Sequence, residues 1–209
     1  MQKIKFILLL ISLFSLLSAF SCNSSDTKTK INEKQNSGSD NFNNYFPLKE
    51  SNKWVYINEG PRDETELFTV QAKDVKKVDG GIQLKVSSFP YLTKDNEERS
   101  LTVKSNGEIE ISNYMGTSGV FIPKPNDFKI SYKWSFGVFN GTVNSGNQTI
   151  ATEDGTYNDC YYIMMTDGFT FSFEMWFKKD VGIVKWGANR TNPPQLKATY
   201  YVLKEHTLN

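Results

Sequence analysis

The sequence predicts an all-β domain, a single antiparallel meander of about ten to twelve strands curled into a half-barrel, barrel or sandwich. Three observations predict this fold class. Apolar and polar residues alternate with a period of two, turn residues separate the alternating segments, and no convincing helical stripe follows the signal region. Alternation of this kind is typical of half-buried antiparallel strands, which have one face on a core and one wetter face.

Three segments show the alternation most clearly: 129–136 with Ile130, Tyr132, Trp134 and Phe136; 82–87 with Ile82, Leu84 and Val86; and 169–178 with Phe169, Phe171, Phe173, Met175 and Phe177. Turn signals fall between such segments, at Asp79-Gly80-Gly81, Ser105-Asn106-Gly107, Asp154-Gly155 and Asp167-Gly168. These residue types tolerate the positive φ angles of tight hairpins, so each is predicted to join two strands.

Residues 1–21 are predicted to form a cleaved signal peptide. Lys3 and Lys5 give a positive start, and a mainly apolar run follows from Phe6 to Phe20. That run is shorter than the roughly 20 residues that a membrane-spanning helix needs. Small residues then lead to Cys22, as in a secretory signal.

The stretch Leu17-Ser18-Ala19-Phe20-Ser21-Cys22 resembles the lipobox of a bacterial lipoprotein. The resemblance implies cleavage between Ser21 and Cys22, and a diacylglyceryl group with an amide-linked acyl chain such as palmitate on Cys22. Asn23 follows the cysteine, and by the same resemblance it favours the outer membrane. Lipid would be the membrane contact, because the processed chain carries no polybasic second anchor. Whether the domain faces the periplasm or the outside stays open.

The rest of the chain divides into the lipidated cysteine with a disordered tether, 22–44, and the all-β domain, 45–209. The tether holds only two large apolar side chains, Ile31 and Phe42, which is too little to offset chain entropy. The domain holds all ten tyrosines and all four tryptophans of the chain. Cys160 has no intrachain partner once Cys22 carries lipid, so it is expected to be a buried, inert thiol.

Composition argues against several classes of function. The net charge is +1, and only three of the 24 basic residues are arginines, which does not favour nucleic-acid binding. One histidine and two cysteines cannot build the usual zinc site, and they leave little room for Ser-His-Asp or Cys-His catalysis. No phosphate loop or dinucleotide motif is present, so we expect no metal and no cofactor.

Three stretches resemble an uncharacterised family of β-rich envelope lipoprotein domains of the Bacteroidota type. They are 45–56 (YFPLKESNKWVY, the FPL…W-x-Y motif), 153–162 (EDGTYNDCYY, a Gly-Thr-aromatic turn before Cys-Tyr) and 178–186 (KKDVGIVKW, the G-V-G-x-V-K strand). The resemblance implies a large curved antiparallel sheet in which these motifs are structural fixtures, with no catalytic residues. From the residues themselves, Trp54 is expected to close the core, and Gly182 to mark a bulge or a close approach of a neighbouring strand.

Candidate ligand-binding residues lie on the polar face of segment 169–178, which reads Thr170, Ser172, Glu174, Trp176 and Lys178. Trp176 beside an acid and hydroxyls is either a stacking platform for a sugar ring or a partner, or a core residue of a curled sheet. Trp186 has the same two interpretations, and Trp134 is a further candidate. A hydrolase would pair Glu174 with Glu108 or Glu110, although a solvated sheet face explains these acids better.

The function predicted from these observations is non-enzymatic. A lipid-anchored domain of the bacterial envelope would bind a small-molecule, glycan or protein partner, or support an envelope assembly. Two alternatives stay open: a carrier that holds a lipid or other apolar ligand inside the curled sheet, and a carboxylate-dependent hydrolase. A carrier needs a cavity lined by aromatic residues of the 130s and 170s strands, whereas an enzyme needs two acids in one cleft.

Overall fold

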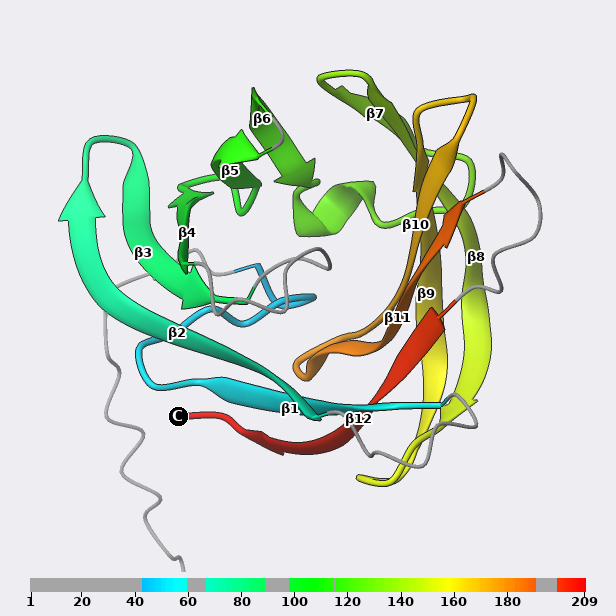
Figure 1. The fold of residues 1–209 in the computed structure, drawn as a ribbon. Coiled ribbons are helices and arrows are strands. Elements are labelled where there is room, and N and C mark those ends of the chain that lie inside the picture. Colours follow the sequence, from blue (N-terminus) through cyan, green and yellow to red (C-terminus); the bar gives the residue numbers. More distant parts are fainter. Residues whose placement is uncertain (1–42, 60–66, 89–97, 115, 191–198) are drawn as a thin grey trace, which may run out of the picture. The chain divides into compact units, whose positions relative to one another are not determined.

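The computed structural model of the chain describes residues 43–59, 67–88, 98–114, 116–190 and 199–209 (Figure 1). The predicted signal peptide, Ser21, Cys22 and the tether up to residue 42 lie outside the described residues. Within the described ranges, no helix has the length and apolar character that crossing a membrane requires.

The described residues form twelve strands and one 3-10 turn. The strands are β1 (Lys53–Asn58), β2 (Leu67–Val78), β3 (Gly81–Ser87), β4 (Glu98–Lys104), β5 (Ile109–Tyr114), β6 (Thr117–Ile122), β7 (Lys133–Phe136), β8 (Phe139–Ala151), β9 (Thr156–Thr166), β10 (Phe171–Lys178), β11 (Gly182–Arg190) and β12 (Thr199–Thr207), and the 3-10 turn is η1 (Pro125–Asp127). The four predicted turn sequences all lie between strands of this series. The prediction of an all-β fold with about ten to twelve strands is confirmed.

All twelve strands belong to one antiparallel sheet, in the order β6-β5-β4-β3-β2-β1-β12-β11-β10-β9-β8-β7. Strands next to one another in sequence are therefore neighbours, except that β1 pairs with β12 and that β6 and β7 are the two edges. The sheet curls until these edges approach, which gives a nearly closed barrel (Figure 1). Of the three predicted forms, a single curled sheet excludes the sandwich.

Side chains close the seam between β6 and β7. Phe121 on β6 meets Phe136 on β7 with ring centroids 5.5 Å apart and nearly perpendicular planes. Gly137, in the turn after β7, lies so close to Thr117 that an added Cβ would come within 2.3 Å of the threonine hydroxyl oxygen. Aromatic packing and this close approach join the two edges where the strand ladder ends.

Two predicted strands are shorter in the structure than the alternation suggested. Ser131 adopts a left-handed φ of 71°, and the amide of Tyr132 donates to the carbonyl of Lys129, so 129–132 is a turn and the strand begins at Lys133. Ile130 is consequently 62% exposed instead of lying on the core. The prediction that strand 129–136 places Ile130 on an apolar face was wrong, because local turn geometry overrides the pattern.

The predicted strand 169–178 also begins later in the structure. The carboxylate of Asp167 accepts hydrogen bonds from the backbone amides of Phe169 and Phe171, at 2.9 Å each. These bonds fold 167–170 into a turn, so strand β10 begins only at Phe171. Phe169 lies in that turn and is 83% exposed, outside the apolar face to which the alternation assigned it.

The chain segment before β1 fills the interior of the sheet. Phe46 and Leu48 are fully buried in the core, with aromatic side chains of distant strands around them. The side-chain amide of Asn43 donates to the carbonyls of Gly107 and Pro123, at 2.9 Å each, and the residue is 0% exposed. Asn43 therefore belongs to the folded domain and not to the tether, to which the sequence assigned 22–44.

The connection between β6 and β7 also folds inward. Phe128, directly after η1, is buried and stacks on Tyr45 with ring centroids 4.0 Å apart and planes 7° from parallel. It also meets Phe177 of β10 edge to face, at 5.5 Å. One end of the sheet is thus filled by two connecting segments, 43–52 and 123–132, packed against each other and against β10.

Candidate functional site

The predicted ligand-binding residues occupy three places in the structure. Glu174 and Trp176 lie on the outer face of β10, whereas the neighbouring Phe173, Met175 and Phe177 line the core. Trp186 lies on the inner face of β11, and Trp134 lies on the edge strand β7. The structure therefore brings Glu174 and Trp176 together and leaves the other two tryptophans apart.

Around Trp176 the outer face carries a group of side chains that we call the outer-face cluster. Its members are Gln148 of β8, Tyr162 of β9, Glu174 and Trp176 of β10, Lys185 of β11 and Tyr200 of β12. Five neighbouring strands contribute, so the cluster depends on the folded sheet and not on any one segment. Only Glu174 and Trp176 are neighbours in sequence.

The register of the strands places Trp176 at the centre of the cluster. Trp176 pairs with Tyr162 on one side and with Lys185 on the other. Its ring stacks on the ring of Tyr162, with centroids 4.8 Å apart and planes 20° from parallel. Its indole NH donates to the side-chain oxygen of Gln148 at 2.5 Å. Trp176 is only 9% exposed, so Tyr162 presents the outer aromatic surface of the pair.

A glycine allows Tyr200 to reach Glu174. Gly187 lies between them, paired with Glu174 on β10 and with Tyr200 on β12. The Tyr200 ring lies over Gly187, where an added Cβ would come within 2.3 Å of a ring carbon. The Tyr200 hydroxyl donates to Oε2 of Glu174 at 3.0 Å. Any larger residue at position 187 would displace this ring and break the contact.

Lys185 supplies the positive charge of the cluster. Its ammonium group lies 5.6 Å from the Trp176 ring centroid and 5.0 Å from that of Tyr200, within the range of cation–π attraction. The same group forms an ion pair with Glu59 at 2.6 Å. Lys185 therefore occupies the position over the two rings that a cationic ligand would otherwise take.

The two tyrosines of the cluster are hydrogen-bond donors at neutral pH. Burial, followed by the negative charge of Glu174, raises the pKa of Tyr200 to about 12 and raises the pKa of Tyr162 further. The Tyr200 hydroxyl donates to Glu174, and the negative charge of the same carboxylate acts on Tyr162. The carboxylate is thus held in one orientation with acceptor capacity left, since two oxygens offer about four lone-pair positions.

A shallow depression lies beside Trp134, on the hairpin formed by β7 and β8. Its volume is about 350 Å³, and it is lined by Lys133, Trp134, Ser135, Asn140, Gly141 and Thr142. In this hairpin Lys133 pairs with Thr142 and Ser135 pairs with Asn140, on either side of the pair Trp134–Gly141. Because neighbouring residues of a strand point to opposite faces, the four polar side chains surround the depression on the outer face. The Trp134 ring packs over Gly141 and lies near Tyr132.

Trp186 packs in the interior. Its ring stacks on Tyr201 with centroids 4.3 Å apart, and Phe68 and Tyr56 meet it edge to face. The residue is 4% exposed and belongs to the core. Of the three candidate tryptophans it has the least contact with solvent.

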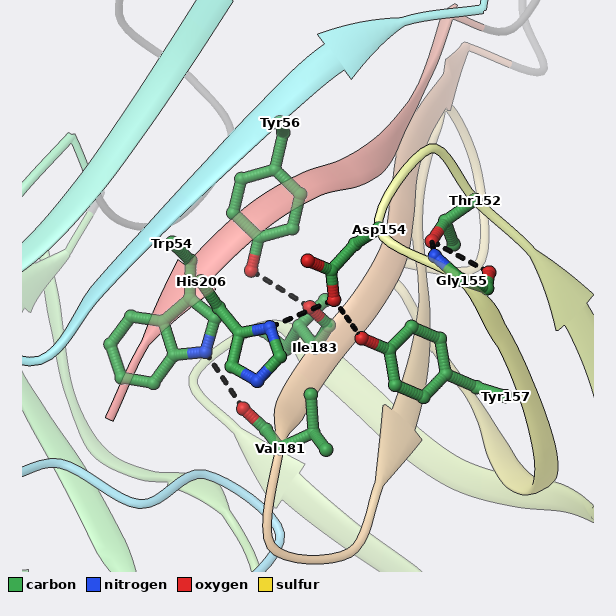
Figure 2. A network of polar contacts seen from close by, with 9 residues as sticks. All are labelled: Trp54, Tyr56, Thr152, Asp154, Gly155, Tyr157, Val181, Ile183 and His206. Atoms are coloured by element: carbon green, nitrogen blue, oxygen red, sulfur yellow. Dashed lines mark hydrogen bonds and ion pairs between the residues drawn. The ribbon is translucent and has the colours of Figure 1, made fainter. Parts of the chain in front are cut away.

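The three motifs that carry the family resemblance meet at one end of the sheet (Figure 2). The indole NH of Trp54 donates to the carbonyl of Val181 at 2.7 Å, and the Tyr56 hydroxyl donates to the carbonyl of Ile183 at 2.9 Å. Between these carbonyls, Gly182 has a φ of +110°, and an added Cβ would lie 3.0 Å from the indole nitrogen of Trp54. The expected close approach at Gly182 is confirmed.

Asp154, from the second motif, joins this end to β12. Its Oδ2 accepts the Tyr157 hydroxyl and lies 2.8 Å from Nδ1 of His206 (Figure 2). Asp154 and His206 are far apart in the chain, so no sequence motif predicts their contact. Asp154 lies in the turn 152–155, where Thr152 and Gly155 are also hydrogen-bonded, so its contact with His206 ties that turn to β12.

Cys160 lies in β9 and is fully buried without a disulfide. Burial raises the pKa of its thiol to about 11, so the thiol is protonated at neutral pH. The expected buried thiol is confirmed. A protonated, enclosed sulfur is a poor nucleophile, which fits a packing role in the strand.

The acids proposed for hydrolysis lie far apart. Glu110 is on the outer face of β5, paired with Lys104 at 2.9 Å, and Glu108 immediately precedes that strand. In the order of the sheet, six strands separate β5 from β10, which carries Glu174. Glu174 therefore does not face one cleft with Glu108 or Glu110. In the part of the chain that the structure describes, no group of three or more histidine, cysteine or acidic side chains is arranged to hold a metal ion.

Known proteins share the fold of this chain. No protein-family model matches the sequence, and no curated protein matches it significantly. A candidate lipoprotein from Parabacteroides distasonis ATCC 8503, solved as a crystal structure, matches with a TM-score of 0.50 and 15% identity over 79% of this chain and 99% of that chain. A candidate exported protein with a YmcC-like fold from Bacteroides fragilis NCTC 9343 matches with a TM-score of 0.47 and 12% identity over 78% and 98% of the two chains. At such identity the Parabacteroides structure supports the fold alone.

Proposed function

We propose that this chain is a lipid-anchored protein of the bacterial envelope whose β-domain binds a ligand, without catalysis, through the outer-face cluster. The observation that carries this proposal is the contact between Tyr200 and Glu174 across Gly187. A carboxylate that an aromatic hydroxyl holds in place, with acceptor capacity to spare on the outer face of a sheet, is suited to orient a polar ligand.

The nature of the hydrogen bonds in the cluster supports this assignment. Glu174 and Gln148 bond to other side chains, and both remain partly exposed. Side-chain partners at a surface can exchange for ligand groups at low cost, because water competes for the same positions. Trp176 contributes by holding Tyr162 and Gln148 in place beneath the ligand.

The carrier alternative finds less support in the interior. The aromatic residues of the 130s and 170s strands pack on one another: Phe139 meets Phe136 at 6.4 Å and Phe173 at 5.6 Å between ring centroids. Phe46 and Leu48 of the inserted segment add to the same core. Among the described residues, these aromatic side chains pack on one another in the core.

The membrane anchor rests on the signal and Cys22. A positive start, a short apolar run and a lipobox-like stretch favour acylation of Cys22, and Asn23 favours the outer membrane. The Parabacteroides protein of similar fold is described as a candidate lipoprotein, which agrees with this proposal. The short polar segment after Cys22 would let the domain reach ligands at some distance from the bilayer.

Labelling with an alkyne analogue of palmitate tests the anchor. We expect the full-length protein expressed in its host to take up the label and to sediment with membranes, and Cys22→Ala to do neither. Cys160→Ala is the matched control, because it removes the other cysteine of the chain and should keep the label. Label retained in Cys22→Ala would contradict acylation at this residue.

Native mass spectrometry of the protein purified from its own envelope tests the binding role. We expect a reproducible added mass on the wild-type protein, and its loss in Glu174→Gln, which removes the charged acceptor of the cluster. Glu110→Gln is the control, because Glu110 is an outer-face acid on the opposite part of the sheet. An added mass that survives Glu174→Gln would contradict binding at this cluster.

A further inference from the structure

We propose that the ligand is an uncharged oligosaccharide that lies across strands β7 to β10, from the outer-face cluster to the depression beside Trp134. This inference rests on the proposed function and adds the class of ligand and its path. It is carried by the register of four strands, which joins two surface features that the sequence separates.

One row of outer-face residues connects the two features. Lys133 of β7 pairs with Thr142 of β8, Thr142 pairs with Met164 of β9, and Met164 pairs with Glu174 of β10. Three interstrand steps of about 4.8 Å give a row of roughly 14 Å, which is longer than one sugar ring. The depression is at one end of this row, and Glu174 with Tyr200 is at the other.

A second, parallel row has the polar chemistry that recognises sugars. Its exposed members are Ser135 and Asn140, which pair with each other. Asn140 pairs in turn with Thr166, whose hydroxyl already bonds to the carbonyl of Phe171 and the amide of Gly168. Ser135 and Asn140 are also hydrogen-bonded to each other at 3.3 Å. Hydroxyl and amide groups act as both donors and acceptors, as sugar hydroxyls do, so Ser135 and Asn140 can bind the hydroxyls of a sugar unit that reaches the depression.

The charges of the surface disfavour a charged ligand. Lys185 lies over the two rings that would attract a cation, and Glu59 neutralises it at 2.6 Å. Glu174 would repel an anion at the aromatic end, and Lys133 would repel a cation at the other end. An uncharged ligand avoids both conflicts. The face of Tyr162 that points away from Trp176 can then stack against the apolar side of a sugar ring, while Glu174 accepts hydrogen bonds from its hydroxyls.

The test is the dependence of binding on chain length. The mature chain with Cys22→Ala would be titrated calorimetrically with β-1,4-linked glucose and N-acetylglucosamine oligomers, from the monosaccharide to the hexasaccharide. We expect the association constant to rise about tenfold between the disaccharide and the tetrasaccharide and then to level off, as the chain comes to span the row.

Two variants separate the inference from the function on which it rests. Ser135→Ala with Asn140→Ala should lower the affinity for the tetrasaccharide about tenfold and leave the disaccharide unchanged, because only the longer ligand reaches the depression. Glu174→Gln should weaken every oligomer. Thr102→Ala, on the outer face of β4, is the control and should change neither.

Each outcome has a distinct meaning. Affinity that does not depend on chain length, or a double variant that binds the tetrasaccharide normally, would overturn the inference and leave the cluster as a binding site. If no oligomer binds while the envelope-purified protein carries a Glu174-dependent mass of another class, the inference fails and the proposed function stands. If neither an oligomer nor an added mass is found, both fail.

Discussion

Two regions of the sheet contain aromatic side chains that carry a hydrogen-bonding group. One is the end where Trp54 and Tyr56 contact β11, which we call the interior end, and the other is the outer-face cluster. The two regions differ in the partners to which these groups bond. At the interior end, Trp54, Tyr56 and Asn43 donate to backbone carbonyls. In the outer-face cluster, Trp176 and Tyr200 donate to the side chains of Gln148 and Glu174. Backbone acceptors are fixed by the fold, whereas side-chain acceptors can turn toward a ligand.

This difference predicts where a substitution should change stability and where it should change the proposed binding. The interior end joins segments that are far apart in sequence, so a change there should lower the free energy of unfolding of the whole domain. The outer-face cluster lies on the side of β10 away from the core residues Phe173 and Met175, so a change there should mainly alter the proposed binding. Four predictions test the comparison, beginning with the largest expected effect.

Trp54→Ala should lower the free energy of unfolding by about 4 kcal/mol, because it removes a fully buried ring and leaves the Val181 carbonyl without its donor. Urea denaturation followed by tyrosine and tryptophan fluorescence measures the change. Should the variant fail to fold, Tyr56→Phe keeps the ring and removes only the hydroxyl bonded to Ile183, and we expect it to cost about 1 kcal/mol. Full stability in both variants would contradict a structural role for this end.

Asn43→Ala should lower the free energy of unfolding by about 2 kcal/mol, since the carbonyls of Gly107 and Pro123 would both lose a buried donor. The same denaturation experiment measures it. Asn106→Ala is a suitable control, because Asn106 lies in the same turn as Gly107 and its side chain bonds only at the exposed surface. A loss equal to that of the control would place Asn43 in the tether after all.

Tyr200→Phe should lower the free energy of unfolding by no more than about 1 kcal/mol, because the ring keeps its place over Gly187 and loses a single, partly exposed hydrogen bond. Binding of the ligand that co-purifies from the envelope should nevertheless weaken, since Glu174 would lose the Tyr200 hydroxyl that orients it. Thermal denaturation and native mass spectrometry of the same sample separate the two effects. A large loss of stability with unchanged binding would contradict the proposal that Tyr200 serves binding more than stability.

Cys160 should give the smallest effect at neutral pH, because the titration of its thiol changes the free energy of unfolding only at high pH. Its pKa is about 11 in the folded domain and close to 9 without burial, so the folded state keeps the proton when the unfolded state loses it. The stabilisation from this group is therefore complete below about pH 9 and is lost as pH rises toward 11. Comparing wild type with Cys160→Ala in urea from pH 8 to pH 11 measures it, and the decline with pH should be less steep in the variant. Identical slopes would contradict a shifted thiol.

The sequence predicted the sheet well and the surface site only in part. Alternation in β3 and β10 and the glycine turns indicated strands, because burial on one face selects apolar residues at every second position. The same rule failed at Ile130 and Phe169, where hydrogen bonds within a turn fix the backbone. For the site, alternation along β10 placed Glu174 and Trp176 on one face. Their partners Tyr162 and Tyr200 lie on other strands, and single-strand alternation says nothing about the register between strands.

The pairing of β1 with β12 has a consequence for the time at which the domain can form. β1 pairs with β2 on one side and with β12 on the other, where Lys53 lies opposite Thr207. The barrel therefore cannot close until β12 is present. Contacts of such long separation slow folding, because the entropy of closing the loop is lost before the contacts form. A chain that crosses a membrane with its N-terminus first would expose an unpaired edge of β1 throughout its passage. The domain would then reach its final form only after release, as the C-terminal strand enters the centre of the sheet.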